Sequence, residues 1–482
     1  MRLVDESISQ ESEEMDTKLL RAVHDRYRCP ETFLDSRLAG KLSADPGYFE
    51  FGSDTVCYGR SLAGAPASKP SPPFPDVLPS ASACEGQVVL PFDPGEVIDN
   101  LRLERYPCSR MGKSERLLKD IYYQLRPLTN RAFRIGIQRL RAATAKRGQF
   151  PEWPVDTTVE KICERLLMLA LKARGSETVP FVWFWPEGAR GCVAMTHDVE
   201  TRAGRDFSPR LADIDDSFEV KSSFQVVPRK RYKVTPKYLD DLRTRGFELC
   251  VQDLNHDGRL FDDREEFLRR VPLINRYGQE FGASGFRSAV LYRNLDWFQE
   301  LDFSYDMSVP NVAPFDPQRG GCCTVMPYFI GNVLELPLTT IQDYTLFYVL
   351  NERSIEIWMN QMERIFERNG MAMFLVHPDY ILESDTLAIY KQLLATLSRL
   401  RGTRELWLAL PGEIDRWWRA RNRMSIEKRG ASWRILGEGA ERAVLAFARV
   451  VDDRLIYELA GAPRDEPQLS DLVTVPSAEA LS

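Results

Sequence analysis

Residues 192–200 read CVAMTHDVE, an apolar run that ends in polar and charged side chains. Residues 371–379 repeat this arrangement as MAMFLVHPD. Short apolar runs bounded by polar residues are typical of the buried strands of a parallel sheet. In β/α folds the loops after such strands meet on one face, which holds the active site. The two stretches therefore predict an α/β fold with polar side chains gathered on one rim.

Strands and helices alternate around these two stretches, from about residue 180 to residue 418. Such repetition favours a (β/α) barrel or a doubly wound sheet. Further strands are predicted at 223–228, 247–251, 285–289, 303–305, 334–336 and 405–409, with helices at 237–244, 265–281, 294–297, 354–368, 387–400 and 413–419.

Composition divides the remainder of the chain. Pro, Ala and Ser dominate a predicted linker. Three short strands form a predicted C-terminal β module. Amphipathic spacing predicts helices at 113–125 and 159–173. The expected parts are a mixed N-terminal segment (1–61), the linker (62–86), a helical and mixed region packing on the barrel (87–189), the barrel (190–422), the β module (423–462) and a disordered tail (463–482).

Charge and composition exclude several classes of protein. The 482 residues include 64 Lys and Arg against 70 Asp and Glu, a net charge of −6, which argues against a nucleic-acid binder. No apolar run approaches about 18 residues, so no transmembrane segment is predicted. The acidic N-terminus lacks the apolar core of a secretory signal, and the nine cysteines include no CxxC pair. We therefore expect reduced cysteines and a cytoplasmic protein; nothing in the sequence specifies an oligomeric state.

Three of the four histidines lie at predicted strand ends: His197, His256 and His377. Carboxylates accompany them, and Arg287 ends another strand. Imidazoles and carboxylates on one rim can hold a divalent metal that polarises a carbonyl group. A single histidine at a strand end more often makes a structural hydrogen bond than a ligand contact, so it is the joint placement of these residues that predicts a site.

Five motifs follow one another within residues 190–420: THDVE (196–200), FELCVQDLNHDGRLF (247–261), GFRSAVLYRNLDWF (285–298), LELP (334–337) and FLVHPDY (374–380). In their order along the chain and in their residues, these motifs resemble those of the polysaccharide deacetylase family, carbohydrate esterase family four. The resemblance implies a distorted (β/α) barrel of about seven strands. It also implies metal-dependent hydrolysis of an N- or O-acetyl group on a sugar.

The resemblance implies a role for each matching residue. Asp198 corresponds to the base that deprotonates water, Arg287 to the arginine that orients the base, and His377 to the general acid that protonates the leaving amine. Glu200 takes the place of the metal carboxylate, because Val199 follows the base. The metal would be zinc or a similar divalent ion.

The metal motif departs from the family pattern. His256 matches the second histidine of HxxxH, but Gln252 stands where the first histidine belongs, and a Gln carbonyl is a weak zinc ligand. His197 could replace the missing ligand, although adjacent residues of a strand face opposite ways. Asn255 and Asp257 beside His256, and Leu336 and Pro337, are predicted to contact the substrate.

Three functions therefore stay open. The first is a deacetylase acting on an N-acetylated sugar, for instance a lipid-linked or nucleotide-linked precursor of a cell-surface polysaccharide. The second is a catalytically silent carbohydrate-binding or scaffold protein on the same fold, which Gln252 favours. The third is an amidohydrolase acting on an acylated small molecule.

Overall fold

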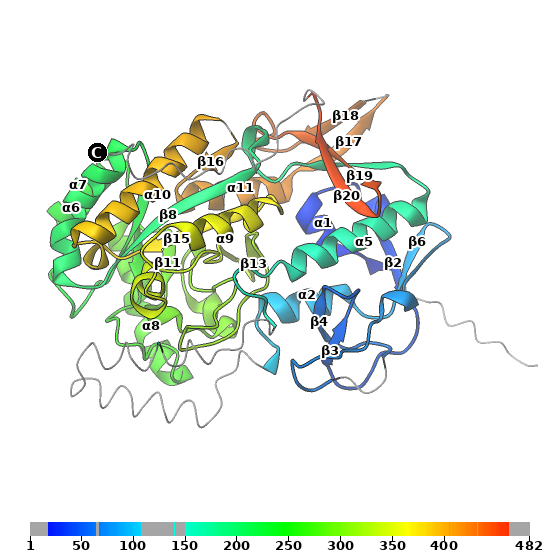
Figure 1. The fold of residues 1–482 in the computed structure, drawn as a ribbon, viewed down its shortest axis with the longest axis horizontal. Helices are drawn as coiled ribbons and strands as arrows, with labels where there is room; N and C mark the ends of the chain where they lie inside the picture. Colours follow the sequence, from blue (N-terminus) through cyan, green and yellow to red (C-terminus); the bar gives the residue numbers. More distant parts are fainter. Residues whose placement is uncertain are drawn as a thin grey trace, which may run out of the picture.

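The computed structural model describes residues 18–63, 67–107, 139, 150–403, 405–430 and 432–461. The predicted helix at 113–125 and the predicted tail at 463–482 lie outside these residues. The N-terminal region lies to the right in Figure 1, and the strands and helices of the predicted barrel lie to its left.

One curled sheet dominates the described part of the chain and confirms the predicted α/β barrel fold. It contains nine strands in the order β13-β14-β12-β11-β10-β9-β8-β15, with β16 also pairing β8. All of its pairings are parallel except that of β13 with β14. Their bounds are β8 Gly191–Val199, β9 Ser222–Val226, β10 Glu248–Gln252, β11 Gly285–Arg287, β12 Tyr305–Asp306, β13 Tyr328–Ile330, β14 Val333–Glu335, β15 Met371–Val376 and β16 Leu406–Leu408.

The alternation of side chains along these strands decides what faces the barrel interior. On β8, Val193 and Met195 pack into an outer core between the sheet and its helices. Cys192 and Ala194 pack into a second core, which continues inside the barrel. Because successive side chains of a strand face opposite ways, this register also turns Asp198 inward and His197 outward.

Helices cover the outer face of the sheet, where Leu211, Leu239, Phe267, Trp358 and Leu393 pack into the outer core. Helix α6 was not predicted; it is rich in charged residues and contains Pro209, which masks its pattern. The helices that follow the barrel strands are α6 Arg202–Ser217, α7 Pro236–Arg243, α8 Arg264–Phe281, α9 Glu356–Phe366, α10 Ser384–Gly402 and α11 Pro411–Arg423.

The N-terminal region forms its own small sheets and shares a core with the barrel interior. Its first sheet has the order β1-β2-β6-β5, and β3 pairs with β4. The predicted linker contributes β5 to this sheet, so part of it is ordered structure. The elements are β1 Lys18–Leu19, α1 Arg21–Tyr27, β2 Asp35–Leu38, β3 Gly47–Glu50, β4 Val56–Gly59, β5 Ser82–Cys84, β6 Gln87–Leu90, α2 Pro94–Arg102 and α5 Thr158–Arg174.

The strands of the predicted C-terminal β module pair with one another and with a strand that precedes the barrel. β19 (Leu445–Val451) pairs with β20 (Arg454–Leu459) and also with β7 (Thr178–Val182) from the N-terminal side of the barrel. The hairpin of β17 (Ser425–Arg429) and β18 (Ser432–Leu436) lies beside them, and β17 was not predicted. Phe181 and Val182 of β7 are fully buried, so burial of this apolar strand explains the pairing.

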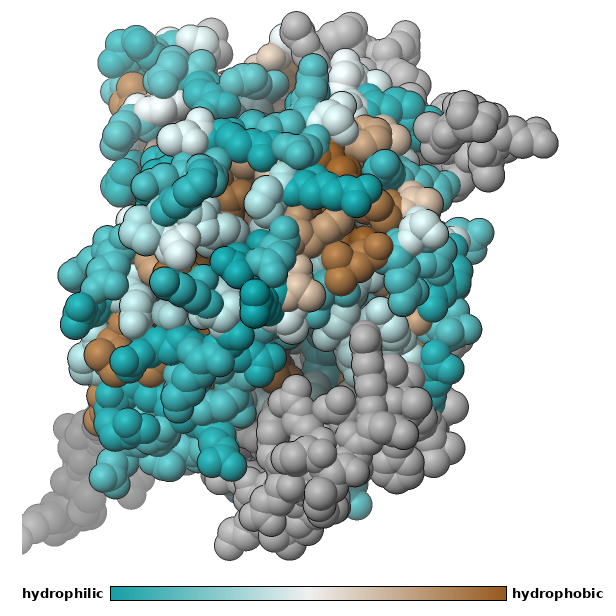
Figure 2. All heavy atoms as spheres, turned by 90° about the vertical axis from the view of Figure 1, so that its left-hand side faces the viewer, coloured by the Kyte–Doolittle hydropathy of each residue, from teal (hydrophilic) through white to brown (hydrophobic). Residues whose placement is uncertain are grey.

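The surface and the cysteines agree with the composition. Figure 2 views the molecule from the side toward which β8 runs, and most of the coloured surface there is hydrophilic, with hydrophobic residues gathered near its middle. The eight described cysteines are all free, and all but Cys84 are buried. Among the described helices, none is long and apolar enough to cross a membrane.

Candidate metal centre and active site

Residues from the C-terminal ends of four parallel strands form the candidate site. Asp198 is the penultimate residue of β8 and Glu200 follows that strand, while Gln252 and Arg287 end β10 and β11. His377 directly follows β15, which pairs with β8. The sheet therefore brings five of the predicted site residues to one end of the barrel.

Arg287 holds the Asp198 carboxylate from inside the barrel. Its Nη1 atom donates to Asp198 Oδ1 at 2.7 Å and to Thr196 Oγ1 at 2.9 Å, and its Nε atom donates to the Met307 carbonyl at 2.9 Å. Arg287 is fully buried and Asp198 is buried. A buried guanidinium with this many partners fixes the direction of the carboxylate and supplies its counter-charge.

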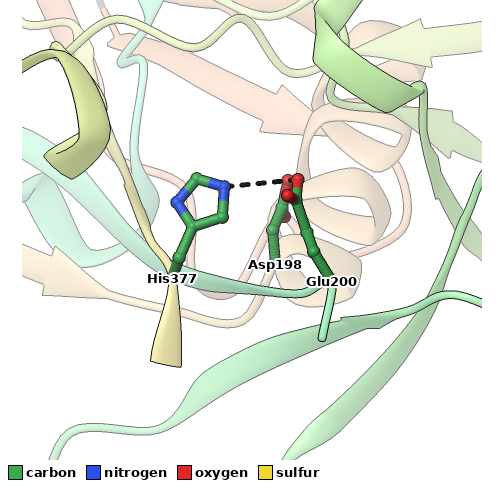
Figure 3. A group of neighbouring side chains, drawn as sticks. All are labelled: Asp198, Glu200 and His377. Carbon is green, nitrogen blue, oxygen red and sulfur yellow. Dashed lines mark ion pairs between the residues drawn. The ribbon is translucent and has the colours of Figure 1, made fainter. Parts of the chain in front are cut away.

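Glu200 lies between two imidazole rings. Its Oε1 atom is 2.6 Å from His256 Nε2 and 3.4 Å from His377 Nε2. Burial opposes ionisation of Glu200, but the charges of the two rings outweigh it and hold the pKa of this carboxyl well below its usual range. Figure 3 shows the His377 ring directed at the adjacent carboxylates of Asp198 and Glu200.

The Gln252 side chain links the two carboxylates. Its Nε2 atom donates to Asp198 Oδ2 at 2.9 Å and to Glu200 Oε1 at 3.2 Å. Its Oε1 atom is buried and forms no hydrogen bond with any described residue. In this orientation the amide nitrogen, and not the carbonyl that a metal would require, faces the carboxylates.

The loop that carries His256 has an unusual backbone. His256 and Asp253 adopt left-handed φ values of 54° and 49°. Side chains other than glycine rarely adopt such values, at a cost of order 1–3 kcal/mol each. Burial lowers the pKa of His256, yet the Glu200 charge more than compensates and raises it. The loop thus holds the imidazole against Glu200 despite the backbone cost.

His377 is fixed on its other side by Asp343. Its Nδ1 atom is 2.7 Å from Asp343 Oδ1, and its backbone N–H donates to Asp343 Oδ2 at 2.7 Å. Burial disfavours the charged ring, but Asp343 first and Glu200 second raise the pKa of His377 well above its usual value. The ring is therefore held as a proton donor with Nε2 directed into the site.

His197 faces away from the site, as its strand position predicts. Its Nε2 atom is 3.0 Å from Asp215 Oδ2, and its Nδ1 atom is 3.1 Å from the Val376 carbonyl. Ser222 and Tyr390 also donate to the Asp215 carboxylate, at 2.7 and 2.6 Å. Both ring nitrogens are thus occupied on the outer side of the sheet.

The residues predicted to contact the substrate have different environments. Asp257 accepts two hydrogen bonds from Arg270, at 2.7 and 2.9 Å. Leu336 and Pro337 are buried at the end of β14. Asn255 is half-buried, and its Oδ1 atom forms no hydrogen bond with a described residue.

The residues present fit a divalent metal. Asp198, Glu200 and His377 each bring one ligand atom within 4.8 Å of the others. His256 adds a second imidazole next to Glu200, and its Nδ1 atom is buried with no hydrogen bond to a described residue. Carboxylate oxygens with imidazole nitrogens are a donor set that zinc accepts.

Sequence reasoning missed three residues beside the site. Asp343 lies beyond the LELP motif, and only the fold brings it to His377. Tyr380 packs its ring on His377, with centroids 4.7 Å apart. Arg231 donates from Nε to the Glu200 carbonyl at 2.9 Å. The cluster of basic residues at 229–233 was the one available signal for Arg231.

Comparison with known proteins gives similarity to solved structures alone. No protein-family profile matches the chain, and no curated protein matches it. A candidate polysaccharide deacetylase from Mycobacterium smegmatis is 18% identical, with a TM-score of 0.41 over 49% of this chain and 93% of that chain. A family 4 carbohydrate esterase from Streptomyces lividans, solved with acetate, is 9% identical, with a TM-score of 0.30 over 45% and 91%. A peptidoglycan deacetylase from Bacillus subtilis is 11% identical, with a TM-score of 0.31 over 47% and 90%.

Other matching structures are described as a deacetylase with substrate and as a domain of carbohydrate esterase family four, the family that the motifs resemble. The similarity covers about half of this chain and concerns its fold.

Proposed function

We propose that this protein is a metal-dependent deacetylase that hydrolyses the N-acetyl group of a sugar or glycan precursor. The observation that carries the proposal is the convergence of Asp198, Glu200 and His377 within 4.8 Å, with Arg287 behind Asp198. In this proposal Asp198 is the base, His377 is the acid and Glu200 is the metal carboxylate, and their proximity at one end of the barrel supports these roles.

Glu200 and His256 would hold the metal, with zinc as the expected ion. A zinc ion, when bound, would lower the pKa of a water molecule and polarise the amide carbonyl. Gln252 would supply a third ligand only if its amide turned, because its Nε2 atom now donates to the carboxylates.

The protein side chains divide the proton transfers between them. Asp198, held in place by Arg287, accepts the proton of the attacking water as it adds to the acetyl carbonyl. The C–N bond then breaks, and His377 Nε2 donates a proton to the departing amine. Asp343 keeps the other ring nitrogen of His377 occupied, so the proton leaves from Nε2.

A second candidate is a catalytically silent carbohydrate-binding protein. The Gln252 amide donates to both Asp198 and Glu200, so it satisfies the two carboxylates without a metal. A site of this kind would keep the barrel and bind a glycan without hydrolysing it.

One experiment separates the two candidates. Zinc content and acetate release are measured for the wild type, for Asp198→Asn and for the control Asp415→Asn, which alters a buried carboxylate on α11. The panel contains N-acetyl sugars, oligosaccharides and small amides. Acetate from the wild type and the control, but not from Asp198→Asn, supports the deacetylase. Absence of both zinc and acetate supports the silent protein, whereas activity on small amides alone supports an amidohydrolase.

A further inference from the structure

A group of basic residues lies next to the candidate site and has no role in the mechanism above. We call residues 229–233, which read RKRYK, the cationic loop. The loop follows β9, the strand that pairs with β8 along Met195–Val199. Arg229, Lys230 and Lys233 are exposed, and Arg231 is half-buried.

The cationic loop is anchored to the backbone of the site. The Tyr232 hydroxyl donates to the Val199 carbonyl at 2.6 Å and accepts from the Val227 N–H at 3.0 Å. Arg231 Nε donates to the carbonyl of Glu200 itself, at 2.9 Å. The backbone of a loop held in this way loses little further conformational entropy on binding.

The four cations of the loop have no acidic partner among the described residues. Other basic side chains of the barrel are paired: Lys221 and Arg245 contact Asp216, and Arg270 contacts Asp257. The Arg231 guanidinium is also close enough to His256 for its charge to act on that ring. Unpaired, preorganised cations at the rim of a site attract an anionic ligand.

We propose that the cationic loop binds a phosphate or diphosphate group that the substrate carries beside its acylated amine. This inference rests on the proposed deacetylase function. In a 2-acetamido sugar the anomeric carbon is the neighbour of the carbon that bears the amide. An ester of phosphate at that carbon would therefore lie next to the loop when the amide lies at Asp198 and His377. Several cations match the multiple charges and acceptor oxygens of a phosphate better than the single charge of a sugar carboxylate.

The binding test uses inorganic diphosphate as the probe. The triple variant Arg229→Gln/Lys230→Gln/Lys233→Gln removes three exposed charges and leaves Arg231, which touches Glu200, in place. The matched control Lys172→Gln/Lys391→Gln/Arg399→Gln removes three exposed charges from α5 and α10. We expect about tenfold weaker diphosphate binding in the loop variant and a change below about twofold in the control, by calorimetric titration. Equal effects in the two variants, or none, would overturn the inference.

The activity test compares two substrates that differ in charge. For N-acetylglucosamine 1-phosphate, the loop variant should have a KM raised about tenfold with little change in kcat. For the neutral methyl glycoside, both constants should stay at the wild-type values. A neutral substrate that responds to the variant as strongly as the phosphate would contradict an anion site, as would a stronger effect on an N-acetylated sugar carboxylate.

The two proposals can fail separately. If diphosphate binding depends on the loop but no substrate releases acetate, the deacetylase proposal is wrong and the anion site stands. If acetate is released from neutral and phosphorylated sugars alike in both triple variants, the anion site is wrong and the deacetylase stands. Parallel assays with a uridine diphosphate sugar and with an isoprenoid diphosphate sugar in detergent show whether a nucleotide or a lipid carries the phosphate.

Discussion

The carboxylate of Asp343 holds His377 at two points, accepting the backbone N–H at 2.7 Å and lying 2.7 Å from the ring Nδ1 atom. Asp343 lies in the segment between β14 and β15, whereas His377 directly follows β15, the strand beside β8. This contact therefore sets both the direction and the protonation of the proposed general acid.

Replacing Asp343 with Asn should change the pH dependence of the reaction. Because Asp343 raises the pKa of His377, its loss should let the ring lose its proton at lower pH. We expect the alkaline limb of the activity profile to move to lower pH and kcat to fall by about 10- to 100-fold. Acetate release across pH measures both effects. An unshifted profile in Asp343→Asn would show that His377 does not titrate in the reaction; Asp415→Asn is the control.

The stability of the metal-free protein should depend on His377. The folded pKa of His377 lies well above 6.5, so its ion pairs stabilise the fold fully below pH 6.5 and are lost as pH rises through the folded value. In a chelating buffer, the free energy of unfolding should therefore fall more for the wild type than for His377→Gln between about pH 6 and about pH 9. Urea titrations measure it, and Lys391→Gln, on an exposed position of α10 outside the site, should behave like the wild type.

Arg287 and Asp198 should be strongly coupled. Arg287→Met leaves the Asp198 carboxylate buried without its guanidinium, which should cost about 3–5 kcal/mol of unfolding free energy. The double variant Asp198→Asn/Arg287→Met removes both charges and should regain much of that loss, while remaining inactive. Urea unfolding of the two single variants and the double variant measures the coupling, and simple additivity of their effects would disprove it.

Gln252→His should strengthen zinc binding. The Gln252 side chain already reaches both Asp198 and Glu200, so an imidazole at this position can offer nitrogen to a metal held there. We expect at least about tenfold higher affinity in a competition titration with a chelator. Gln279→His, on the exposed face of α8, controls for the added histidine. An unchanged affinity would show that residue 252 does not face the metal.

His197→Gln should lower the stability of the protein and leave its zinc affinity unchanged. The ring of His197 pairs with Asp215 on the outer side of the sheet, so its loss should lower the unfolding free energy by about 1–3 kcal/mol. Zinc affinity should stay within about twofold of the wild type, whereas His256→Gln should weaken it by more than about tenfold. A large loss of affinity in His197→Gln would instead identify it as a ligand.

Much of the barrel could be predicted from local pattern. Apolar runs mark β8 and β15 because a buried parallel strand is mostly apolar on both faces. The run at 371–376 matches β15, whereas β8 continues beyond its apolar run to Val199. Helix α6 was not predicted, because its many charged residues and Pro209 make its apolar spacing difficult to recognise. The pairing of the predicted C-terminal β module with β7 could not be predicted, since it joins residues far apart in the sequence.

The sequence by itself determined the residue types of the site and the strand ends that carry them. The reason is that side chains alternate between the two faces of a strand, so adjacent residues alone show which face each one takes. Thus Asp198, Gln252 and Arg287 share the inner face, and His197 lies opposite. Only the tertiary structure decided that His377 meets Asp343, that the amide nitrogen of Gln252 bridges the carboxylates, and that Arg231 reaches Glu200. These contacts join different loops, and loop positions follow from packing across the whole barrel, not from the pattern within any one segment.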